Sequence, residues 1–280
     1  MTDLRERLQQ KLSGTYEFER ELTGGGMSRV FVAEETALGR KVVVKVLPTD
    51  VTEGVNLDRF KREIQLAARL QHPHIVQMLS AGEIEGAPYY TMPFVEGESL
   101  RATLATTAAL PITRAISILR DLARALAYAH ERGIVHRDIK PDNILLSGGS
   151  ATVTDFGIAK AISAARNDSN TTLTQVGSSI GTPAYMAPEQ AAADPSTDHR
   201  ADIYSFGCVA YELLAGRPPF IAKTPQKLLA AQMGETPQRI TDLRPDTPGE
   251  LADLIMRCLE KDADKRPQKA ADLVSVLDTV

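Results

Sequence analysis

The pattern of hydrophobic and polar positions changes along the chain. From about Tyr16 to Phe94 it is mostly a strand pattern, because the runs YEFEREL, VFVAEE and RKVVVKVL are alternating or β-branched and are separated by turn residues. One helix is predicted among them from apolar residues at positions 57, 60, 64, 67 and 68. A short amphipathic helix is expected before the first strand, since leucines recur at positions 4, 8 and 12.

After Phe94 the pattern becomes helical. The run ITRAISILRDLARALAYAHERG has a helical period and ends at Gly133, a typical C-terminal stop. The run DIYSFGCVAYELLAG is apolar nearly all round, which predicts a helix buried inside a domain. We therefore divide the chain into a leading helix (1–14), a strand-rich part (15–92), a linker (93–97) and a mostly helical part (98–280).

Composition and charge exclude a few classes of function. The chain is 43% hydrophobic and 24% charged, as in ordinary globular proteins, and its net charge of −4 gives no support for nucleic-acid binding. No apolar run approaches the roughly 18 residues of a membrane span. The opening MTDLRERLQQKL contains too many charges for a signal peptide. Cys208 and Cys258 lack CxxC spacing, which favours free, buried thiols in a reducing cytosol.

The stretch ELTGGGMSRVFVAEE contains three consecutive glycines, Gly24, Gly25 and Gly26. They can form a hairpin turn, since glycine reaches positive φ at little steric cost. They can also let backbone N–H groups approach a phosphate closely. Taken alone the run favours the hairpin, because short motifs have many false positives.

Two polar stretches lie in the helical part. VHRDIKPDNILL contains Asp138 and Asn143, and VTDFGIAK presents Asp155 twelve residues after Asn143. An asparagine and an aspartate are hard oxygen ligands suited to Mg²⁺ carried on phosphates. Asp138 is a carboxylate that can accept a proton or orient a hydroxyl. By itself the first stretch is equally compatible with a solvated turn.

Lys45 lies in the otherwise apolar strand VVVKVL. A charged side chain is costly there unless it is paired, and Glu63 on the following helix is a candidate partner. A glycine turn for phosphate, a paired lysine, a carboxylate and two metal ligands together specify phosphoryl transfer.

With these motifs in this order, the chain resembles the catalytic domain of bacterial eukaryotic-type serine/threonine protein kinases, from about Tyr16 to Leu277. The resemblance implies an α+β, bilobal protein-kinase fold. Its N-lobe is a small antiparallel sheet with one main helix, and its C-lobe is large and mostly helical. The resemblance also implies phosphorylation of serine and threonine hydroxyls on proteins, with ATP and Mg²⁺, or Mn²⁺ in its place, as cofactors.

The resemblance gives the polar residues their roles. Lys45, positioned by Glu63, holds the α and β phosphates of ATP. Asp138 orients the acceptor hydroxyl and takes its proton, while Lys140 steadies the γ-phosphate. The implied metal ligands are Asn143 and Asp155.

Further residues are implied in the activation segment, 155–189, and around it. Thr182 of GTPAYMAPEQ should form a hydrogen bond near Asp138 and Lys140, and together with Lys140 it indicates serine/threonine specificity. A pair between Glu189 and Arg266 is expected to be structural. The same is expected of His136 and Asp202, which would brace the catalytic loop.

The nucleotide site departs from the family pattern. The glycine loop GxGxxGxV falls on Thr23, Gly25, Ser28 and Val30, so only the middle glycine is kept. Because threonine is β-branched and stiffens the entry to the turn, weaker or slower nucleotide exchange is expected, without loss of binding. The residues implied to contact nucleotide are Leu22, Gly24, Gly25, Gly26, Ser28, Val30, Val43, Lys45, Met92, Pro93, Val95, Asn143, Leu145 and Asp155.

Around adenine, Val43 replaces the family's usual alanine, and Met92 is the expected gatekeeper. Pro93 has no N–H, but the first hinge residue normally offers adenine only its carbonyl. Val95 would supply the N–H. Val30 and Leu145 would sandwich the base.

Regulation by phosphorylation is also implied. Arg137 is expected to receive a phosphate from the activation segment, with Thr174 as the leading site and Thr172 and Thr171 as further ones. A homodimer would serve autophosphorylation between chains. No nucleic acid and no membrane contact are expected within this segment. The expected location is cytoplasmic, with the chain as part of a longer, membrane-anchored kinase.

An alternative is a pseudokinase, a nucleotide-binding scaffold without catalysis. Pseudokinases usually lack the lysine, the catalytic aspartate or a metal ligand. This sequence keeps all of these residues: Lys45, Glu63, Asp138, Asn143 and Asp155. An active enzyme is therefore favoured.

Overall fold

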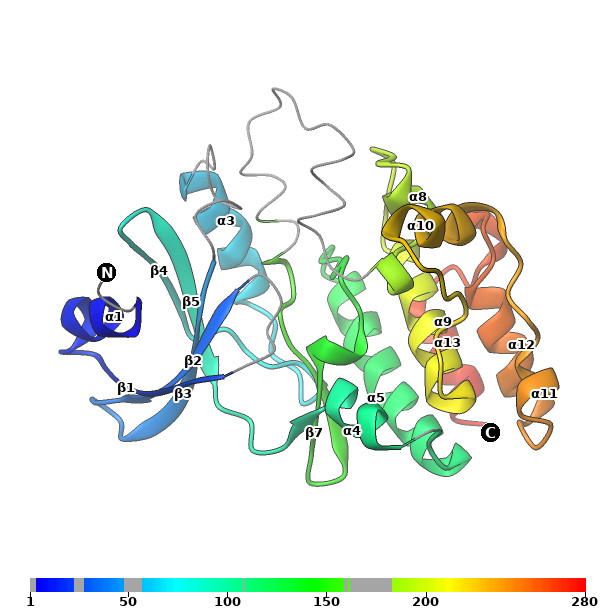
Figure 1. Ribbon diagram of the computed structural model, residues 1–280, viewed down its shortest axis with the longest axis horizontal. Coiled ribbons are helices and arrows are strands. Elements are labelled where there is room, and N and C mark those ends of the chain that lie inside the picture. Colours follow the sequence, from blue (N-terminus) through cyan, green and yellow to red (C-terminus); the bar gives the residue numbers. More distant parts are fainter. Residues whose placement is uncertain (1–3, 23–27, 48–56, 108, 159–160, 162–182) are drawn as a thin grey trace. The chain divides into compact units, whose positions relative to one another are not determined.

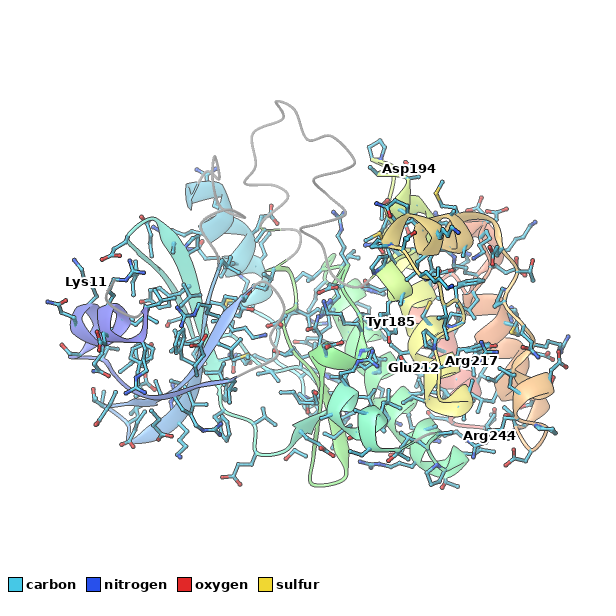
Figure 2. All side chains as sticks on the ribbon, viewed as in Figure 1. Lys11, Tyr185, Asp194, Glu212, Arg217 and Arg244 are labelled. Atoms are coloured by element: carbon cyan, nitrogen blue, oxygen red, sulfur yellow. The ribbon has the colours of Figure 1, made fainter. Side chains whose placement is uncertain are left out.

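The computed structural model describes residues 4–22, 28–47, 57–107, 109–158, 161 and 183–280 (Figure 1), and the side chains are drawn in Figure 2. These residues fall into two compact units, and each is described by itself. The first unit holds the described residues up to Gln71, the segment Val76–Glu96 and Ala161. The second holds His72–Ile75 and residues 97–158 and 183–280. The predicted α+β class is confirmed.

The first unit is built on a five-stranded antiparallel sheet. In spatial order its strands are β1 (Tyr16–Leu22), β2 (Arg29–Glu35), β3 (Arg40–Val46), β5 (Ala87–Pro93) and β4 (Ser80–Ile84). Among the described residues of this unit, helices α1 (Leu4–Leu12) and α3 (Leu57–Ala67) accompany the sheet. The hydrophobic pattern predicted both of these helices.

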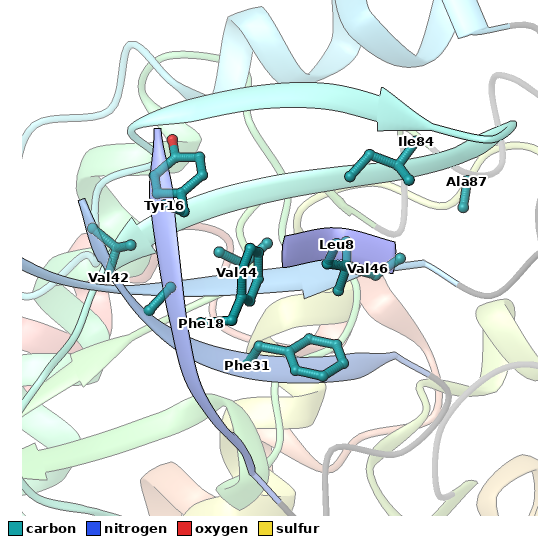
Figure 3. Close-up of a cluster of buried hydrophobic side chains, with 10 residues drawn as sticks. Leu8, Tyr16, Phe18, Phe31, Val42, Val44, Val46, Ile84 and Ala87 are labelled. Atoms are coloured by element: carbon teal, nitrogen blue, oxygen red, sulfur yellow. The ribbon is translucent and has the colours of Figure 1, made fainter. Parts of the chain in front are cut away.

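The core of this unit lies between α1 and one face of the sheet (Figure 3). Leu8 of α1 is fully buried, as are Phe31 of β2 and Val44 of β3. The rings of Phe18 and Phe31 meet edge to face, with centroids 6.0 Å apart, a favourable aromatic geometry. The leucine spacing of α1 therefore places its apolar side on this face of the sheet.

Polar groups of α1 also bond the outer edge of β1. The side-chain amide of Gln9 donates from Nε2 to the carbonyl of Tyr16 (3.3 Å), and its Oε1 accepts from the N–H of Phe18 (2.8 Å). Arg5 donates to the carbonyl of Glu19 (3.3 Å). Gln9 thus makes the two bonds that a neighbouring strand would otherwise make.

The second unit is mostly helical and contains one small antiparallel sheet. The sheet has the order β6 (Glu98–Ser99), β7 (Ile144–Ser147), β8 (Ser150–Val153). The helices and short 3₁₀ turns are α4 (Leu100–Thr106), α5 (Ile112–His130), η1 (Pro141–Asn143), η2 (Pro183–Tyr185), α8 (Pro188–Ala191), α9 (Arg200–Ala215), α10 (Pro225–Gly234), α11 (Ile240–Leu243), α12 (Gly249–Cys258), η3 (Ala263–Lys265) and α13 (Ala270–Leu277).

The central helix of this unit is α9, whose residues from Ala201 to Leu214 are all buried, as its apolar pattern predicts. It packs closely on α12, because a Cβ added at Gly207 would lie only 2.7 Å from the Cβ of Cys258. The thiols of Cys208 and Cys258 are free and buried, as their spacing predicted.

The helix α5 ends at His130, slightly before the predicted stop. Glu131 is its C-cap, and Gly133 then takes the left-handed conformation (φ 71°) that turns the chain away. Among the described residues, no helix is both long and apolar enough to cross a lipid bilayer.

Candidate active site

In the first unit, four of the residues expected to contact nucleotide form one apolar cluster. Val30, Val43 and Met92 are buried together, and Leu22 packs against them. The strand register explains this: Val30 pairs with Leu22 across β1 and β2, and Val43 pairs with Met92 across β3 and β5. The structure therefore brings these four residues onto one face of the sheet, opposite the core that contains Leu8.

The other residues expected at the nucleotide in this unit are distributed as follows. Lys45 is half-buried in β3, where it pairs in register with Val30, and Glu63 is half-buried in α3. Pro93 ends β5, and Val95 follows it, also half-buried. Ser28 is half-buried just before β2. The glycine-run residues Gly24, Gly25 and Gly26 lie outside the described residues.

In the second unit, Asp138, Lys140 and Asn143 are joined by short hydrogen bonds. The ammonium of Lys140 lies 2.8 Å from Oδ2 of Asp138 and 3.1 Å from Oδ1. The amide Nδ2 of Asn143 donates to the carbonyl of Asp138 (2.8 Å) and to its Oδ2 (3.0 Å). Leu145 follows in β7, half-buried, two residues after Asn143. The carboxylate of Asp138 is thus fixed from two sides.

Asp202, in the first turn of α9, holds the loop that carries Asp138 through hydrogen bonds to its backbone. The backbone N–H of His136 donates to Oδ2 of Asp202 (2.8 Å), and that of Arg137 donates to Oδ1 (2.7 Å). His130 donates to Oδ2 as well (2.8 Å). Burial by itself would raise the pKa of Asp202, but these hydrogen bonds and the two histidines outweigh it and hold that pKa below 3.8. The predicted bracing role of Asp202 is confirmed.

His136 connects this loop to the segment that carries Asp155. Its Nδ1 accepts from the N–H of Asp138 (3.2 Å), so Nε2 has the hydrogen and donates to the carbonyl of Thr154 (2.8 Å). The N–H of Thr154 donates in turn to the carbonyl of Asn143 (3.0 Å). The structure therefore brings the backbone next to Asp155 against that of Asn143, and His136 has the structural role predicted for it.

Two residues of this site have unusual backbone angles. Arg137 (φ 67°) and Asp155 (φ 68°) lie in the left-handed region, which costs a non-glycine residue on the order of 1–3 kcal/mol. The bonds to Asp202 hold Arg137 in place, and Gly157 (φ 75°) allows the turn after Asp155. Such outliers cluster at functional sites, and the sequence pattern did not indicate them.

The donor set of Asn143 and Asp155 fits a divalent cation on phosphates. Because Nδ2 of Asn143 is turned toward Asp138, the amide oxygen is the atom that this side chain can offer a cation. Asp155 adds a carboxylate, whose Oδ1 accepts from the hydroxyl of Thr154 (3.2 Å). Mg²⁺ usually takes one or two such oxygen ligands and completes its shell with phosphate and water.

The predicted pair between Glu189 and Arg266 is present. The guanidinium, fully buried, donates to both carboxylate oxygens of Glu189 at 2.6 and 2.8 Å. It also donates to the carbonyls of Arg200, Glu260 and Lys261 at 3.0, 2.8 and 3.0 Å. All five N–H groups of Arg266 are therefore satisfied. Four other predicted residues, Thr171, Thr172, Thr174 and Thr182, lie outside the described residues.

A polar cluster formed by Arg101 of α4, Tyr185 of η2 and Glu212 of α9 was not predicted from the sequence. Arg101 donates to Glu212 (2.8 Å) and to the hydroxyl of Tyr185, and that hydroxyl also bonds to Glu212. Figure 2 labels Tyr185 and Glu212 beside each other. The signal was present: a single carboxylate late in an otherwise apolar buried helix needs a cation.

The chain matches known proteins over nearly its whole length. The protein kinase domain family matches residues 16–276. Serine/threonine-protein kinase pkn2 of Myxococcus xanthus is 40% identical over 95% of this chain and 32% of its own length. Serine/threonine-protein kinases PknB of Mycolicibacterium smegmatis and of Mycobacterium leprae are each 40% identical over 94% of this chain and 42% of their own length. The chain thus spans less than half the length of these curated relatives.

Proposed function

Since the chain belongs to the protein kinase domain family and its relatives are named serine/threonine-protein kinases, we propose that it transfers the γ-phosphate of ATP to serine and threonine hydroxyls of proteins. The observation that carries this proposal is the bonded set of Asp138, Lys140 and Asn143, on a loop braced by Asp202. The division into N-lobe (15–92), linker (93–97) and C-lobe (98–280) is part of the proposal.

The proposed reaction uses these residues as follows. The acceptor oxygen bonds to the γ-phosphorus, the bond from that phosphorus to the bridging oxygen of ADP breaks, and the hydroxyl proton passes to the carboxylate of Asp138. Lys140, 2.8 Å from Asp138, offers its charge to the transferred group. When bound at Asn143 and Asp155, Mg²⁺ or Mn²⁺ supplies charge that neutralises the phosphate oxygens. Lys45, paired with Glu63, holds the α and β phosphates.

The direct test compares the wild-type chain with Asp138→Asn. Both are expected to melt at a higher temperature when ATP and Mg²⁺ are added, because a ligand of the folded state stabilises it. Only the wild type should transfer labelled phosphate to a generic basic protein, and the variant should be slower by about 10²- to 10⁴-fold.

The same experiment separates the two candidate functions. A wild-type chain that binds nucleotide in the melting assay and transfers no phosphate would favour the pseudokinase scaffold. A chain that shows neither effect at saturating nucleotide would contradict both functions.

The proposal includes regulation and partners. Autophosphorylation is expected at Thr174, with Thr172 and Thr171 as further sites, and Arg137 is the expected receptor of the phosphate. A homodimer would bring one chain's acceptor to another's site. The cytoplasmic location, as part of a longer membrane-anchored kinase, stays a prediction.

A further inference from the structure

Arg101 contacts two parts of the site that are far apart in the sequence. From the first turn of α4, its Nη1 donates to Oε1 of Glu212 (2.8 Å) and its Nη2 donates to the hydroxyl of Tyr185. Its Nε lies 3.5 Å from Oδ2 of Asp142, in η1. The hydroxyl of Tyr185 donates to Oε2 of Glu212, so three side chains share one bonded ring.

Part of the role of Arg101 is to supply a counter-charge. Glu212 is 5% exposed and Tyr185 is 4% exposed, whereas the side chain of Arg101 is 37% exposed. Removing the cation that pairs with a buried carboxylate usually destabilises a fold strongly. If Arg101 had a purely structural role, this counter-charge would be its whole contribution.

The position of Tyr185 indicates more than a structural role. Its carbonyl accepts from the hydroxyl of Ser205 (2.7 Å), and the side-chain amide of Gln232 donates to the carbonyl of Ala184 (2.7 Å). The backbone of η2 is thus anchored to α9 and α10, while the side chain of Tyr185 reaches Arg101.

The same segment touches the catalytic loop on both sides of Asp138. Gln190 donates to the carbonyl of Arg137 (2.9 Å), directly before Asp138, and Arg101 links Tyr185 to Asp142, four residues after it. An acceptor hydroxyl that reaches Asp138 therefore has this segment, residues 183–190, as its neighbour.

We infer that Arg101 is a positioning residue for phosphoryl transfer, which fixes the catalytic loop at Asp142 against the segment 183–190 at Tyr185 and so sets where a protein acceptor lies relative to Asp138. The inference rests on the proposed function. Misplacing reacting groups by about 1 Å can slow a reaction on the order of 10²-fold. Nucleotide binding does not depend on this contact.

The test uses the full chain and the double variant Arg101→Met with Glu212→Gln. This pair removes both charges at similar volume, so no buried charge is left without a partner. We expect a melting temperature near that of the wild type and an unchanged KM for ATP. With a generic basic protein as acceptor, kcat/KM should fall by about 10- to 100-fold.

Two single variants complete the design. Arg101→Lys keeps a positive charge for Glu212 but cannot reach Tyr185 and Asp142 with the same planar fork, so it should fold and still lose acceptor efficiency. The matched control is Arg114→Met in α5, where the arginine donates to the carbonyl of Gly149 (2.5 Å) at a surface turn. It should behave as the wild type.

The outcomes separate the inference from the function on which it rests. A folded double variant or Arg101→Lys variant with wild-type kcat/KM for the acceptor would show that Arg101 is only a counter-charge. A wild-type chain that transfers no phosphate to any acceptor would refute the proposed function itself, and the inference with it. A parallel rise in the KM for ATP would also overturn the inference, because a general disturbance of the fold would explain it.

Discussion

At the scale of single residues, the stability of the fold depends strongly on the buried side chain of Arg266. Its guanidinium is fully buried, and all of its N–H groups have acceptors, from Glu189 and three carbonyls. Buried arginine is rare unless paired, because its desolvation must be compensated. The pair therefore joins the segment after η2 to the loop before α13. Its loss should lower the stability of the fold more than it directly lowers the rate of phosphoryl transfer.

We predict that Arg266→Met lowers the free energy of unfolding by about 3–5 kcal/mol, because it removes the cation from the carboxylate of Glu189, whose side chain is only 15% exposed. Urea unfolding monitored by circular dichroism would measure it. The control is Arg239→Met, which removes an arginine from the exposed pair with Asp253 (2.7 Å) and should cost about 0–1 kcal/mol. Equal losses in the two variants would contradict the role given to Arg266.

Asp202 should make stability depend on pH. Its pKa is below 3.8 in the folded chain, so the carboxylate adds stability above that value, and the stability is lost as the pH falls through the folded pKa. At neutral pH, Asp202→Asn should cost about 3 kcal/mol, because two backbone N–H groups and His130 lose a charged acceptor.

The measurement is urea unfolding of wild type and variant between pH 7 and pH 3. The difference between the two should be constant down to about pH 5 and then shrink. A difference that does not change with pH would mean that charge on Asp202 contributes nothing. Asp253→Asn, at an exposed position, serves as the comparison.

At the scale of elements, the hydrophobic pattern predicts what depends on neighbours in sequence. The strands at Tyr16–Leu22 and Arg40–Val46 and the buried helix α9 follow directly from residue periodicity. The pattern could not predict contacts between distant parts of the chain. Arg101 and Glu212 are 111 positions apart, and only the tertiary fold brings these two side chains of α4 and α9 within bonding distance.

The same reason limits how far the site could be predicted. The motif order named Asp138, Lys140 and Asn143, and the structure joins them. No local signal indicated the left-handed backbone of Arg137. It follows from a distant residue, because Asp202 of α9 accepts hydrogen bonds from two successive N–H groups of the loop, those of His136 and Arg137. The roles of the named residues stay predictions until activity is measured.

The contact between α9 and α12 gives a prediction at this scale. Gly207→Ala should lower the free energy of unfolding by about 1–3 kcal/mol, because the new Cβ would lie 2.7 Å from the Cβ of Cys258 and the helices would have to separate. Helix propensity alone predicts the opposite sign, by about 1 kcal/mol.

The control for this prediction is Gly234→Ala at the end of α10, where a Cβ meets nothing within 4 Å. It should leave stability unchanged or raise it by about 0.5 kcal/mol. Denaturant midpoints of both variants would measure the difference. A stabilised Gly207→Ala variant would show that α9 and α12 have room between them.

At the scale of the whole molecule, the residues named in the proposal are divided between the two units. The first gives the apolar cluster of Val30, Val43 and Met92, and the second gives the loop of Asp138. The proposed regulation requires an acceptor threonine from one chain in the site of another. The rate of autophosphorylation should therefore depend on the association of two chains.

We predict that autophosphorylation occurs between chains. When a full chain with Asp138→Asn is mixed with wild type, ATP and Mg²⁺, label should appear on the inactive chain, mainly in the peptide that contains Thr174. The rate should rise with total protein concentration. Mass spectrometry of the two chains, distinguished by an isotope label, would measure it.

The control is the inactive chain with the additional change Thr174→Ala, which should lose most of the label. Label confined to the wild-type chain, at a rate independent of concentration, would instead indicate transfer within one chain.

The hydrogen bonds of Gln9 to the edge of β1 have a consequence for handling this protein. An open strand edge is a template on which further chains can polymerise by strand addition, and charged or bonded edges prevent this. A preparation shortened to begin at Tyr16 would uncover the carbonyl of Tyr16 and the N–H of Phe18 together with the apolar face that Leu8 protects. Such a fragment would be prone to precipitate as β-rich aggregates. The leading helix therefore keeps the chain from aggregating through this edge.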